Sequence, residues 1–287
     1  MNESGIILID KPVGISSFGV VHRLRKITGI KKIGHTGTLD PFASGLLPVC
    51  IGRATRLVDF IITSDKEYLA EMQLGIKTDT ADITGEIIQE QEIPQISDSE
   101  IAEKAKEILT ITEQIPPKYS AIKINGKRAY KLARENEDFQ MKSRPIKIHS
   151  FEIIEIDLPK IVYRAKVSKG TYIRTLSETF AEKLNCIATT TNLRRISSGE
   201  IDISKAVKLD DLTNENWQNH LIDIAPIFPD YPKIELDAKN LENFKNGRRF
   251  YVDFEDSERV LVLNEKQVCQ GFAQIENGKF QPKIVLI

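Results

Sequence analysis

The spacing of hydrophobic residues changes along the chain in a way that predicts both strands and helices. The apolar run from Gly5 to Asp10 predicts a short buried strand, and the alternation from Tyr68 to Leu74 predicts another. Between them, Ser16 or Ser17 can cap a helix that ends before Gly29. The apolar residues of this helix are Val20, Val21, Leu24 and Ile27.

The middle of the chain predicts three further helices and a hairpin. Ser97 or Ser99 caps one helix, Arg128–Glu135 forms a short basic one, and Thr171 caps the third. Asn125-Gly126 is a turn signal typical of a hairpin. The apolar faces of the two longer helices are expected to be Ile101, Ala105, Ile108 and Leu109 in one, and Ile173, Leu176, Phe180 and Leu184 in the other.

Residues 146–156 and 161–167 read as two strands joined by a polar turn. Because strands and helices alternate irregularly along the chain, we predict an α+β fold rather than a parallel α/β sheet. Three prolines within residues 226–232 predict a linker and a domain boundary near residue 230. The remainder, 233–287, reads as a small β-rich domain with turns at Asn246-Gly247 and Asn277-Gly278.

Composition agrees with an ordinary globular protein and narrows the setting. Of the 287 residues, 41% are hydrophobic and 28% charged, and no apolar run is long enough to span a membrane. The N-terminus lacks the basic start of a signal peptide, so we expect a cytoplasmic protein. Cys50, Cys186 and Cys269 are odd in number and widely separated, which predicts buried reduced thiols and neither disulfides nor a metal site.

The formal net charge is −1, yet basic residues gather in two windows that contain no acid. Residues 11–39 and residues 118–134 are these windows, and tyrosines are interleaved in the second. Such windows in a neutral chain favour two surfaces that face a nucleic acid. Their basic residues are Lys11, Arg23, Arg25, Lys26, Lys31 and Lys32, and then Lys118, Lys123, Lys127, Arg128, Lys131 and Arg134.

Residues 33–48 hold three glycines, two prolines, one histidine and a single carboxylate, Asp40. Glycines allow tight turns, and Pro41 restricts Asp40 to an extended or turn conformation. The composition therefore predicts a constrained loop with Asp40 on it. By these residues alone Asp40 is an ordinary turn aspartate.

This loop resembles a motif of a known family. The segment Gly34–Gly45, Gly-His-Thr-Gly-Thr-Leu-Asp-Pro-Phe-Ala-Ser-Gly, is similar to the active-site motif of the TruB family, the tRNA pseudouridine-55 synthases. The resemblance extends in order over roughly residues 5–200. Its further segments are Leu8–Gly14, Asp65–Tyr68, Thr78–Gly85, Ile115–Ala121, Ser168–Thr175 and Leu193–Arg195.

The resemblance implies a catalytic domain over 1–230 with a mixed, mainly antiparallel sheet, and a PUA-like RNA-binding domain over 233–287. It implies that uridine 55 in the T-loop of tRNA is flipped out and isomerised to pseudouridine. Asp40 would be the catalytic carboxylate, paired with Arg174. The product is an isomer of the substrate, so the reaction requires no cofactor and no metal.

The resemblance also implies the substrate contacts. Tyr68 would stack on the uracil and serve in catalysis, Tyr172 and Leu193 would complete the pocket, and His35 would occupy space vacated in the RNA loop. An insertion over about 114–145 would clamp the RNA backbone. The expected backbone contacts are Lys11, Lys118, Lys123, Lys127, Arg128 and Lys131.

Three alternatives differ from this enzyme in the residues or segments that they require. A catalytically silent RNA-binding protein on the same scaffold would not need Asp40 and Arg174 together. A metal-dependent nuclease using Asp79 and Asp82 is disfavoured, because no histidine or glutamate completes a ligand set there. A relative that works inside a guide-RNA particle generally carries basic tails, which this chain lacks. We therefore expect a standalone monomer that reads the tRNA T-arm.

Overall fold

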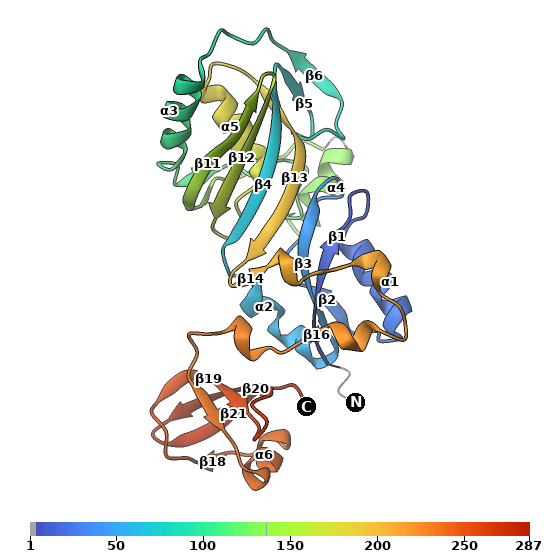
Figure 1. Cartoon of the computed structure of the whole chain (residues 1–287), viewed down its shortest axis with the longest axis vertical. Coiled ribbons are helices and arrows are strands. Elements are labelled where there is room, and N and C mark those ends of the chain that lie inside the picture. The colour runs from blue at the N-terminus through green and yellow to red at the C-terminus, as the bar shows by residue number, and fades with distance from the viewer. Residues whose placement is uncertain (1–3, 136) are drawn as a thin grey trace. The chain divides into compact units, whose positions relative to one another are not determined.

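The structure is a computed structural model that describes residues 4–135 and 137–287 (Figure 1). By internal contacts the chain forms two compact units. The first contains the residues up to Leu39, Leu46–Ile62 and Gly199–Ile287, and the second contains Asp40–Gly45 and Thr63–Ser198. Helices and mainly antiparallel strands occur in mixed order, so the predicted α+β class is confirmed.

Four long antiparallel strands form the sheet of the second unit (Figure 1). Their spatial order is β11 (Ile148–Asp157), β12 (Lys160–Val167), β4 (Lys66–Leu74) and β13 (Ala188–Ser198). The first residues of β3 (Ser44–Ile51) run parallel to β13, with Ser44 opposite Arg194.

Two helices, α3 (Asp98–Ile108) and α5 (Ile173–Lys183), contact this sheet. Every second residue of β4, from Lys66 to Leu74, is buried, while those between are partly exposed. One face of the sheet is therefore covered and the other faces outward, as alternation in a half-buried strand requires.

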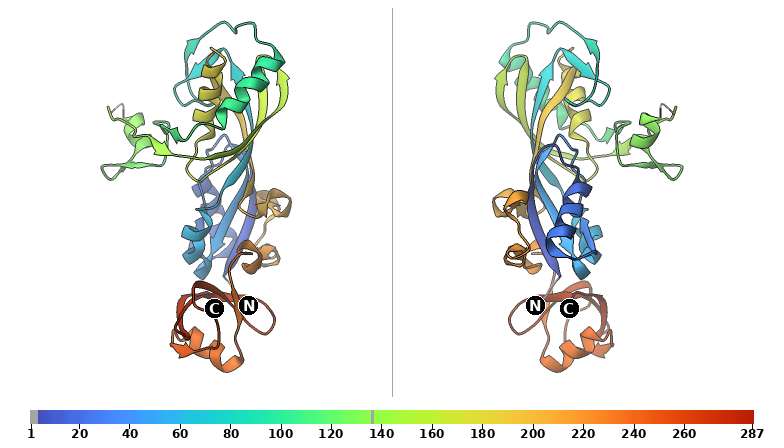
Figure 2. Two further views of the ribbon diagram at one scale, coloured as in Figure 1. Left: turned by 90° about the vertical axis from the view of Figure 1, so that its left-hand side faces the viewer. Right: turned by 90° about the vertical axis from the view of Figure 1, so that its right-hand side faces the viewer.

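Small two-stranded elements decorate the second unit. β5 (Ile76–Thr78) pairs with β6 (Ile87–Glu90), and β7 (Glu113–Gln114) pairs with β10 (Arg144–Pro145). The predicted Asn125-Gly126 hairpin joins β8 (Lys123–Ile124) to β9 (Lys127–Arg128), and α4 (Ala129–Arg134) follows. Figure 2 shows this hairpin and helix standing out from the sheet.

In the first unit, β1 (Gly5–Lys11) lies next to β3, and β2 (Ile33–His35) pairs with β3. Helix α1 (Ser17–Thr28) begins after Ser16, whose side chain accepts from Gly19 N, and ends at Gly29, as predicted. Short elements complete this part: α2 (Val58–Ile61), β14 (Ile201–Asp202), β15 (Val207–Lys208), β16 (Leu221–Ile222), and 3₁₀ turns at Gly52–Leu57, Ile203–Lys205, Leu209–Asp211, Trp217–His220 and Ala225–Ile227.

Residues 233–285 form a five-stranded sheet with one helix. Its strand order is β17 (Lys233–Glu235), β19 (Ser257–Leu263), β20 (Cys269–Glu276), β21 (Lys279–Val285) and β18 (Phe250–Tyr251). The sheet shares a core with the rest of the first unit. Phe272 of β20 stacks on Phe60 of α2, with ring centroids 5.8 Å apart.

Three local predictions need correction. Leu109 ends α3 as its C-cap and is exposed, so it does not belong to the apolar face. Thr171 does not cap α5, because the N-cap is Tyr172 and the Thr171 hydroxyl lies by Ser168 instead. The C-terminal part is not made of strands alone: α6 (Ala238–Lys245) forms there, capped by Asp237, and Asn246-Gly247 terminates it.

Within the part of the chain that the structure describes, no helix is both long and apolar enough to cross a membrane. Cys50, Cys186 and Cys269 are all buried and free, as predicted.

Candidate active site

Asp40 lies on the loop between β2 and β3, where the glycine and proline content predicted a constrained turn. Its carbonyl accepts a hydrogen bond from Ala43 N at 3.1 Å, which closes the turn. The preceding residue, Leu39, is fixed by the buried Ser17, whose hydroxyl bonds both its N–H and its carbonyl. The backbone around Asp40 is thus held from both sides.

Gly45 explains why this loop lies against β13. Its φ of +102° is a conformation that favours glycine, and an added Cβ would lie 2.3 Å from the carbonyl oxygen of Arg195. Only a residue without a side chain permits the approach. The Asp40–Gly45 segment is consequently fastened to the sheet that carries the other candidate residues.

The carboxylate of Asp40 forms an ion pair with Arg174, with 3.0 Å between Oδ2 and Nε. The Nε–H bond is not aligned for a hydrogen bond, so the contact is electrostatic. Arg174 is 4% exposed at its side chain and Asp40 is 32% exposed. An ionised carboxylate is therefore held next to a buried cation while part of it stays open to a ligand.

Three further contacts fix the guanidinium of Arg174. Its Nη1 donates to the carbonyl of Thr80 at 2.8 Å and to Asp82 Oδ2 at 3.2 Å, and its Nη2 donates to the carbonyl of Tyr119 at 2.9 Å. Arg174 thus ties together three of the segments that carry the resemblance, at 78–85, 115–121 and 168–175. Its rotation is restricted, which sets the direction from which it approaches Asp40.

Asp82 is a site residue that sequence reasoning missed. Its Oδ2 contacts Arg174, while its Oδ1 accepts from Thr84 N at 3.0 Å and from the hydroxyls of Thr80 and Thr84. The side chain is buried and fully used in orienting the arginine. Its place among threonines in the 78–85 motif suggested only a polar turn. What identifies Asp82 is its contact with Arg174, which is distant in sequence, and no local pattern predicts such a contact.

Tyr68 and Leu193 lie on the covered face of the sheet. Tyr68 is opposite Arg195, and Leu193 is opposite Ala70, on neighbouring antiparallel strands. Residues in these positions point to the same side. Tyr163, opposite Ala70 on β12, donates to the carbonyl of Ile173 at 3.3 Å, which places the start of α5 over this face. Tyr68, Leu193 and Arg174 therefore share one side of the sheet.

Tyr172 directly precedes α5 and is partly exposed. Burial raises the pKa of its phenol above the ordinary value, and the negative charge of Asp40 adds to the rise. The tyrosine consequently stays neutral at physiological pH. A neutral ring beside a carboxylate is suited to an uncharged base such as uracil.

His35 and Lys11 belong to the first unit. His35 ends β2, and its Nδ1 accepts from Gly37 N at 3.4 Å. Lys11 is wholly buried, and its Nζ donates to the carbonyls of Pro12 and Ile15 at 2.9 and 2.7 Å. The expectation that Lys11 is a surface contact for phosphate is therefore wrong: its ammonium group closes the turn before α1.

The basic residues expected in the insertion are exposed: Lys118, Lys123, Lys127, Arg128 and Lys131. Three of them also have internal contacts, and the Nζ of Lys118 lies 5.8 Å from the centroid of the Phe139 ring. Lys127 pairs with Glu137 at 2.9 Å and Glu135 at 3.9 Å, and Arg128 donates to the carbonyl of Ala121. Lys123 lies in β8 of the hairpin and Lys131 lies in α4, and both are exposed, so the surface keeps its positive charge.

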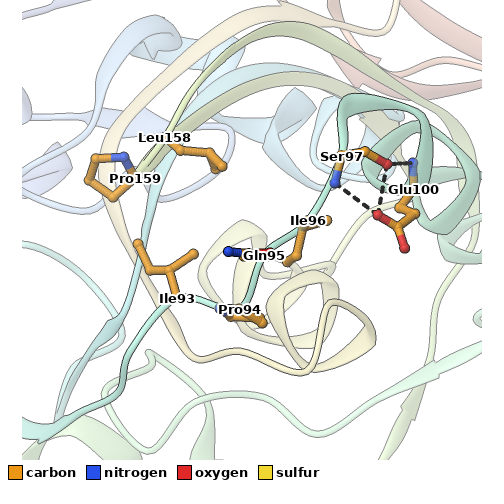
Figure 3. A pocket seen from close by; sticks show the side chains of 8 residues that line it. All are labelled: Ile93, Pro94, Gln95, Ile96, Ser97, Glu100, Leu158 and Pro159. Carbon is orange, nitrogen blue, oxygen red and sulfur yellow. Dashed lines mark hydrogen bonds between the residues drawn. The ribbon is translucent and has the colours of Figure 1, made fainter.

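A pocket of the second unit lies away from Asp40 and Arg174. A hollow of about 720 Å³ is lined by the loop at Ile93–Ser97, by Glu100 and by the turn at Leu158-Pro159 (Figure 3). Two of its three polar side chains, Ser97 and Glu100, bond one another in the capping box of α3, and the third is Gln95. This hollow is lined by none of the candidate catalytic residues.

Comparison with known proteins agrees with the geometry. Residues 25–173 match the family described as TruB family pseudouridylate synthase (N terminal domain). The chain belongs to this family. A tRNA pseudouridine synthase B of Clostridium novyi is 44% identical over 246 residues, covering 86% of this chain and 85% of the relative. One of Clostridium acetobutylicum is 39% identical over 282 residues, covering 96% of this chain and 97% of the relative.

Among solved structures, a Cbf5–Nop10–Gar1 complex contains a similar chain with a TM-score of 0.73. The match covers 99% of this chain and 85% of that one, at 23% identity. A chain of an H/ACA ribonucleoprotein bound to a substrate RNA gives a TM-score of 0.71 at the same identity, over 100% of this chain and 86% of that one. At this identity the likeness shows that the fold is shared and nothing more.

Proposed function

We propose that this TruB-family enzyme isomerises uridine 55 in the T-loop of tRNA to pseudouridine, with Asp40 as the catalytic carboxylate. The observation that carries the proposal is the ion pair of Asp40 with the buried Arg174, which leaves the carboxylate partly open. The curated relatives named tRNA pseudouridine synthase B support the choice of substrate.

The chemistry suits a site with one charged carboxylate. The N1–C1′ bond breaks, the base turns, and C5 bonds to C1′; the proton on C5 leaves and N1 gains one. No electron is transferred and no atom is added overall. Asp40 acts on the base, on C1′ or on a sugar proton, and each of these roles requires its ionised form. Arg174 stabilises that form, and Asp82 positions Arg174.

A uridine stacked in a loop has to be extruded before it can reach Asp40. Extrusion costs a few kcal/mol, which stacking on an aromatic ring offsets. Tyr68 is the proposed stacking partner and proton acceptor in the late step, while Tyr172 and Leu193 form the rest of the pocket. His35 is proposed to fill the place that the flipped nucleotide leaves in the RNA loop.

The insertion at about 114–145 is proposed to hold the RNA backbone. Its basic residues are exposed on a hairpin and a helix that stand out from the sheet (Figure 2). Phosphate contacts of this kind depend strongly on salt. They orient the T-arm with few base-specific contacts.

Residues 233–287 are proposed to be a PUA-like RNA-binding domain that follows a catalytic domain over 1–230. An exposed basic turn supports this: Lys245, Arg248 and Arg249 follow one another closely, and Gly247 and Arg248 fix the turn by bonds back to α6. Tyr251 is 78% exposed on the adjacent β18, opposite Lys279. An exposed ring among cations is suited to stacking on a nucleotide.

The central experiment incubates the protein with unmodified tRNA, without any additive, and maps pseudouridine by position. We expect the enzyme to modify position 55 as a monomer. We also expect it to be cytoplasmic and to need no guide RNA. Asp40→Asn should abolish the product and leave tRNA affinity within a small factor. Equal yield from variant and wild type would overturn the role of Asp40, and wild-type binding without product would favour a silent RNA-binding protein.

A further inference from the structure

Gln114 makes a two-point contact with the residue that begins α5. Its Nε2 donates to the carbonyl of Tyr172 at 3.0 Å, and its Oε1 accepts from Tyr172 N at 2.8 Å. Gln114 is only 7% exposed. A buried amide that satisfies both backbone groups of one residue holds that residue as a neighbouring strand would.

The contact anchors the residue from which α5 begins. Tyr172 is the N-cap of α5, yet its side chain forms no capping hydrogen bond. Its carbonyl already accepts from Leu176 N at 3.0 Å, so the bond from Gln114 engages its second lone pair. Without Gln114 the Tyr172 N–H would lose its partner. The start of α5, with Arg174 two residues further on, is therefore fixed by a side chain from a distant part of the sequence.

Gln114 also stands at the base of the insertion. It is the last residue of β7, which pairs with β10. In this pair of strands Gln114 lies opposite Arg144, so the two ends of the insertion meet at Gln114. Two more contacts link the insertion to the site: Tyr119 accepts from Arg174 through its carbonyl, and its hydroxyl donates to Asp79 at 3.1 Å. The element that carries the basic hairpin is thus joined directly to Tyr172 and Arg174.

We propose that Gln114 is a positioning residue that couples the RNA-holding insertion to the catalytic centre, by setting the backbone of Tyr172 and, through α5, the placement of Arg174 beside Asp40. The inference rests on the proposed function. It assigns Gln114 no contact with RNA and no part in proton transfer. Its loss should therefore change the rate of the chemical step far more than the affinity for tRNA.

The first test compares Gln114→Leu with Glu113→Gln. Glu113 is the adjacent residue of β7 and is exposed, where it accepts from Ser143 at 3.0 Å, so it is a matched control. We expect Gln114→Leu to lower the single-turnover rate at saturating tRNA by about 10- to 100-fold, with the dissociation constant within threefold of wild type. Glu113→Gln should leave both unchanged.

Gln114→Glu gives a readout that a purely structural role would not produce. A carboxylate can accept from Tyr172 N but cannot donate to its carbonyl, whereas a protonated carboxyl group can do both. Burial beside a carbonyl oxygen favours the neutral form. The rate of Gln114→Glu relative to wild type should therefore rise as pH falls from 8.5 to about 5.5. The ratio for Gln114→Leu should stay flat.

Circular dichroism and thermal melting establish the folded fraction, and rates are expressed per folded enzyme. The inference is overturned if Gln114→Leu, so corrected, keeps its rate within threefold of wild type. It is equally overturned if affinity falls as much as rate, or if the Gln114→Glu ratio does not change with pH. Wild type without product at uridine 55 would instead refute the proposed function, which separates the two failures.

Discussion

At the scale of single residues, the candidate site consists of one partly exposed carboxylate and a buried arginine whose two terminal nitrogens are held by other groups. This arrangement keeps the Asp40 carboxylate charged and sets the direction from which Arg174 approaches it. Arg174 reaches Asp40 through Nε because Asp82, Thr80 and Tyr119 hold its other nitrogens. The consequence is that a residue with no contact to the substrate can control the rate.

Asp82→Asn tests this consequence. The substitution keeps an oxygen for Thr84 N but removes the charge that faces Arg174. Because hydrogen bonds to charged groups contribute about 1.5–3 kcal/mol, we expect a single-turnover rate lower by roughly 10- to 100-fold with little change in tRNA affinity. Asp157→Asn, which removes an exposed carboxylate at the end of β11, is the control. Equal rates for the two variants would contradict the positioning role.

Lys66 makes a prediction about pH and stability. Burial and the nearby positive charge of Arg195 lower the pKa of Lys66 to about 8, from 10.5 in the unfolded chain. Between these values the unfolded chain keeps a proton that the folded protein has released, so the free energy of unfolding rises with pH through this window. Below pH 8 the folded state carries the full cost of the buried charge.

Lys66→Met should remove that dependence. At pH 7 the free energy of unfolding of Lys66→Met should exceed that of wild type by an amount of the order of 1–3 kcal/mol. This difference between variant and wild type should narrow toward pH 10. Urea unfolding at pH 7, 8, 9 and 10 measures it. Lys166→Met, on the exposed side of β12, shows whether the loss of any lysine has the same effect. A difference that widens with pH would mean that Lys66 is charged and stabilising.

At the scale of elements, the pairing of β3 with β13 holds the loop that carries Asp40 in place, and Gly45 permits it. Gly45→Ala forces a Cβ against the Arg195 backbone, whereas Gly170→Ala adds one with nothing within 4 Å. Both glycines have positive φ, so their difference isolates the clash. We expect Gly45→Ala to lower the free energy of unfolding by about 2 kcal/mol more than Gly170→Ala does, which corresponds to a Tm lower by about 4–8 °C. Gly45→Ala should also lose activity. Equal melting temperatures would rule out the clash.

The elements that were predicted correctly are those whose signals are local. Ser16 and Gly29 bound α1, Ser97 caps α3, and Asn125-Gly126 turns the hairpin, because capping and turn chemistry act within a few residues. Thr171 carried a similar signal, but Gln114, 58 residues away in sequence, holds the start of α5 one residue later. Local patterns cannot predict such a contact.

Helix α6 was missed although its signals are present. Asp237 caps it by accepting from Asn240 N at 2.7 Å, and Leu241 and Phe244 lie three residues apart on its apolar side. In the sequence they stand between β-branched segments and a turn signal, which favoured strands. The helix is stabilised by tertiary packing of Phe244 on Phe280, at 6.0 Å between ring centroids.

The Asp40 site could be predicted only from the family resemblance. An Asp-Pro pair by itself is common in turns and does not indicate a catalytic residue.

At the scale of the whole molecule, a chain of net charge −1 can bind a polyanion only if its charges are segregated. The second basic window meets this condition on the insertion. The first meets it in part, because Lys11 is buried and Arg23 pairs with Asp210 at 2.6 Å. The basic turn of the C-terminal sheet was not expected from the sequence. It provides a further cationic surface, and its contribution can be measured separately.

Arg248→Ala combined with Arg249→Ala should weaken binding of full-length tRNA several-fold at moderate salt, while the single-turnover rate at saturating tRNA stays at the wild-type value. Each phosphate contact that is lost should reduce the slope of log Kd against log salt by about 0.7–0.9. Filter binding at several salt concentrations measures the affinity for tRNA and the slope.

Removing two charges from any surface lowers nonspecific attraction, so a matched control is required. Lys233→Ala with Lys266→Ala removes two exposed lysines from the same sheet, on β17 at the edge opposite β18 and in the β19–β20 turn. If both double variants reduce the slope equally, the basic turn is only part of a general field; if only the arginine pair does so, the C-terminal sheet holds RNA through this turn.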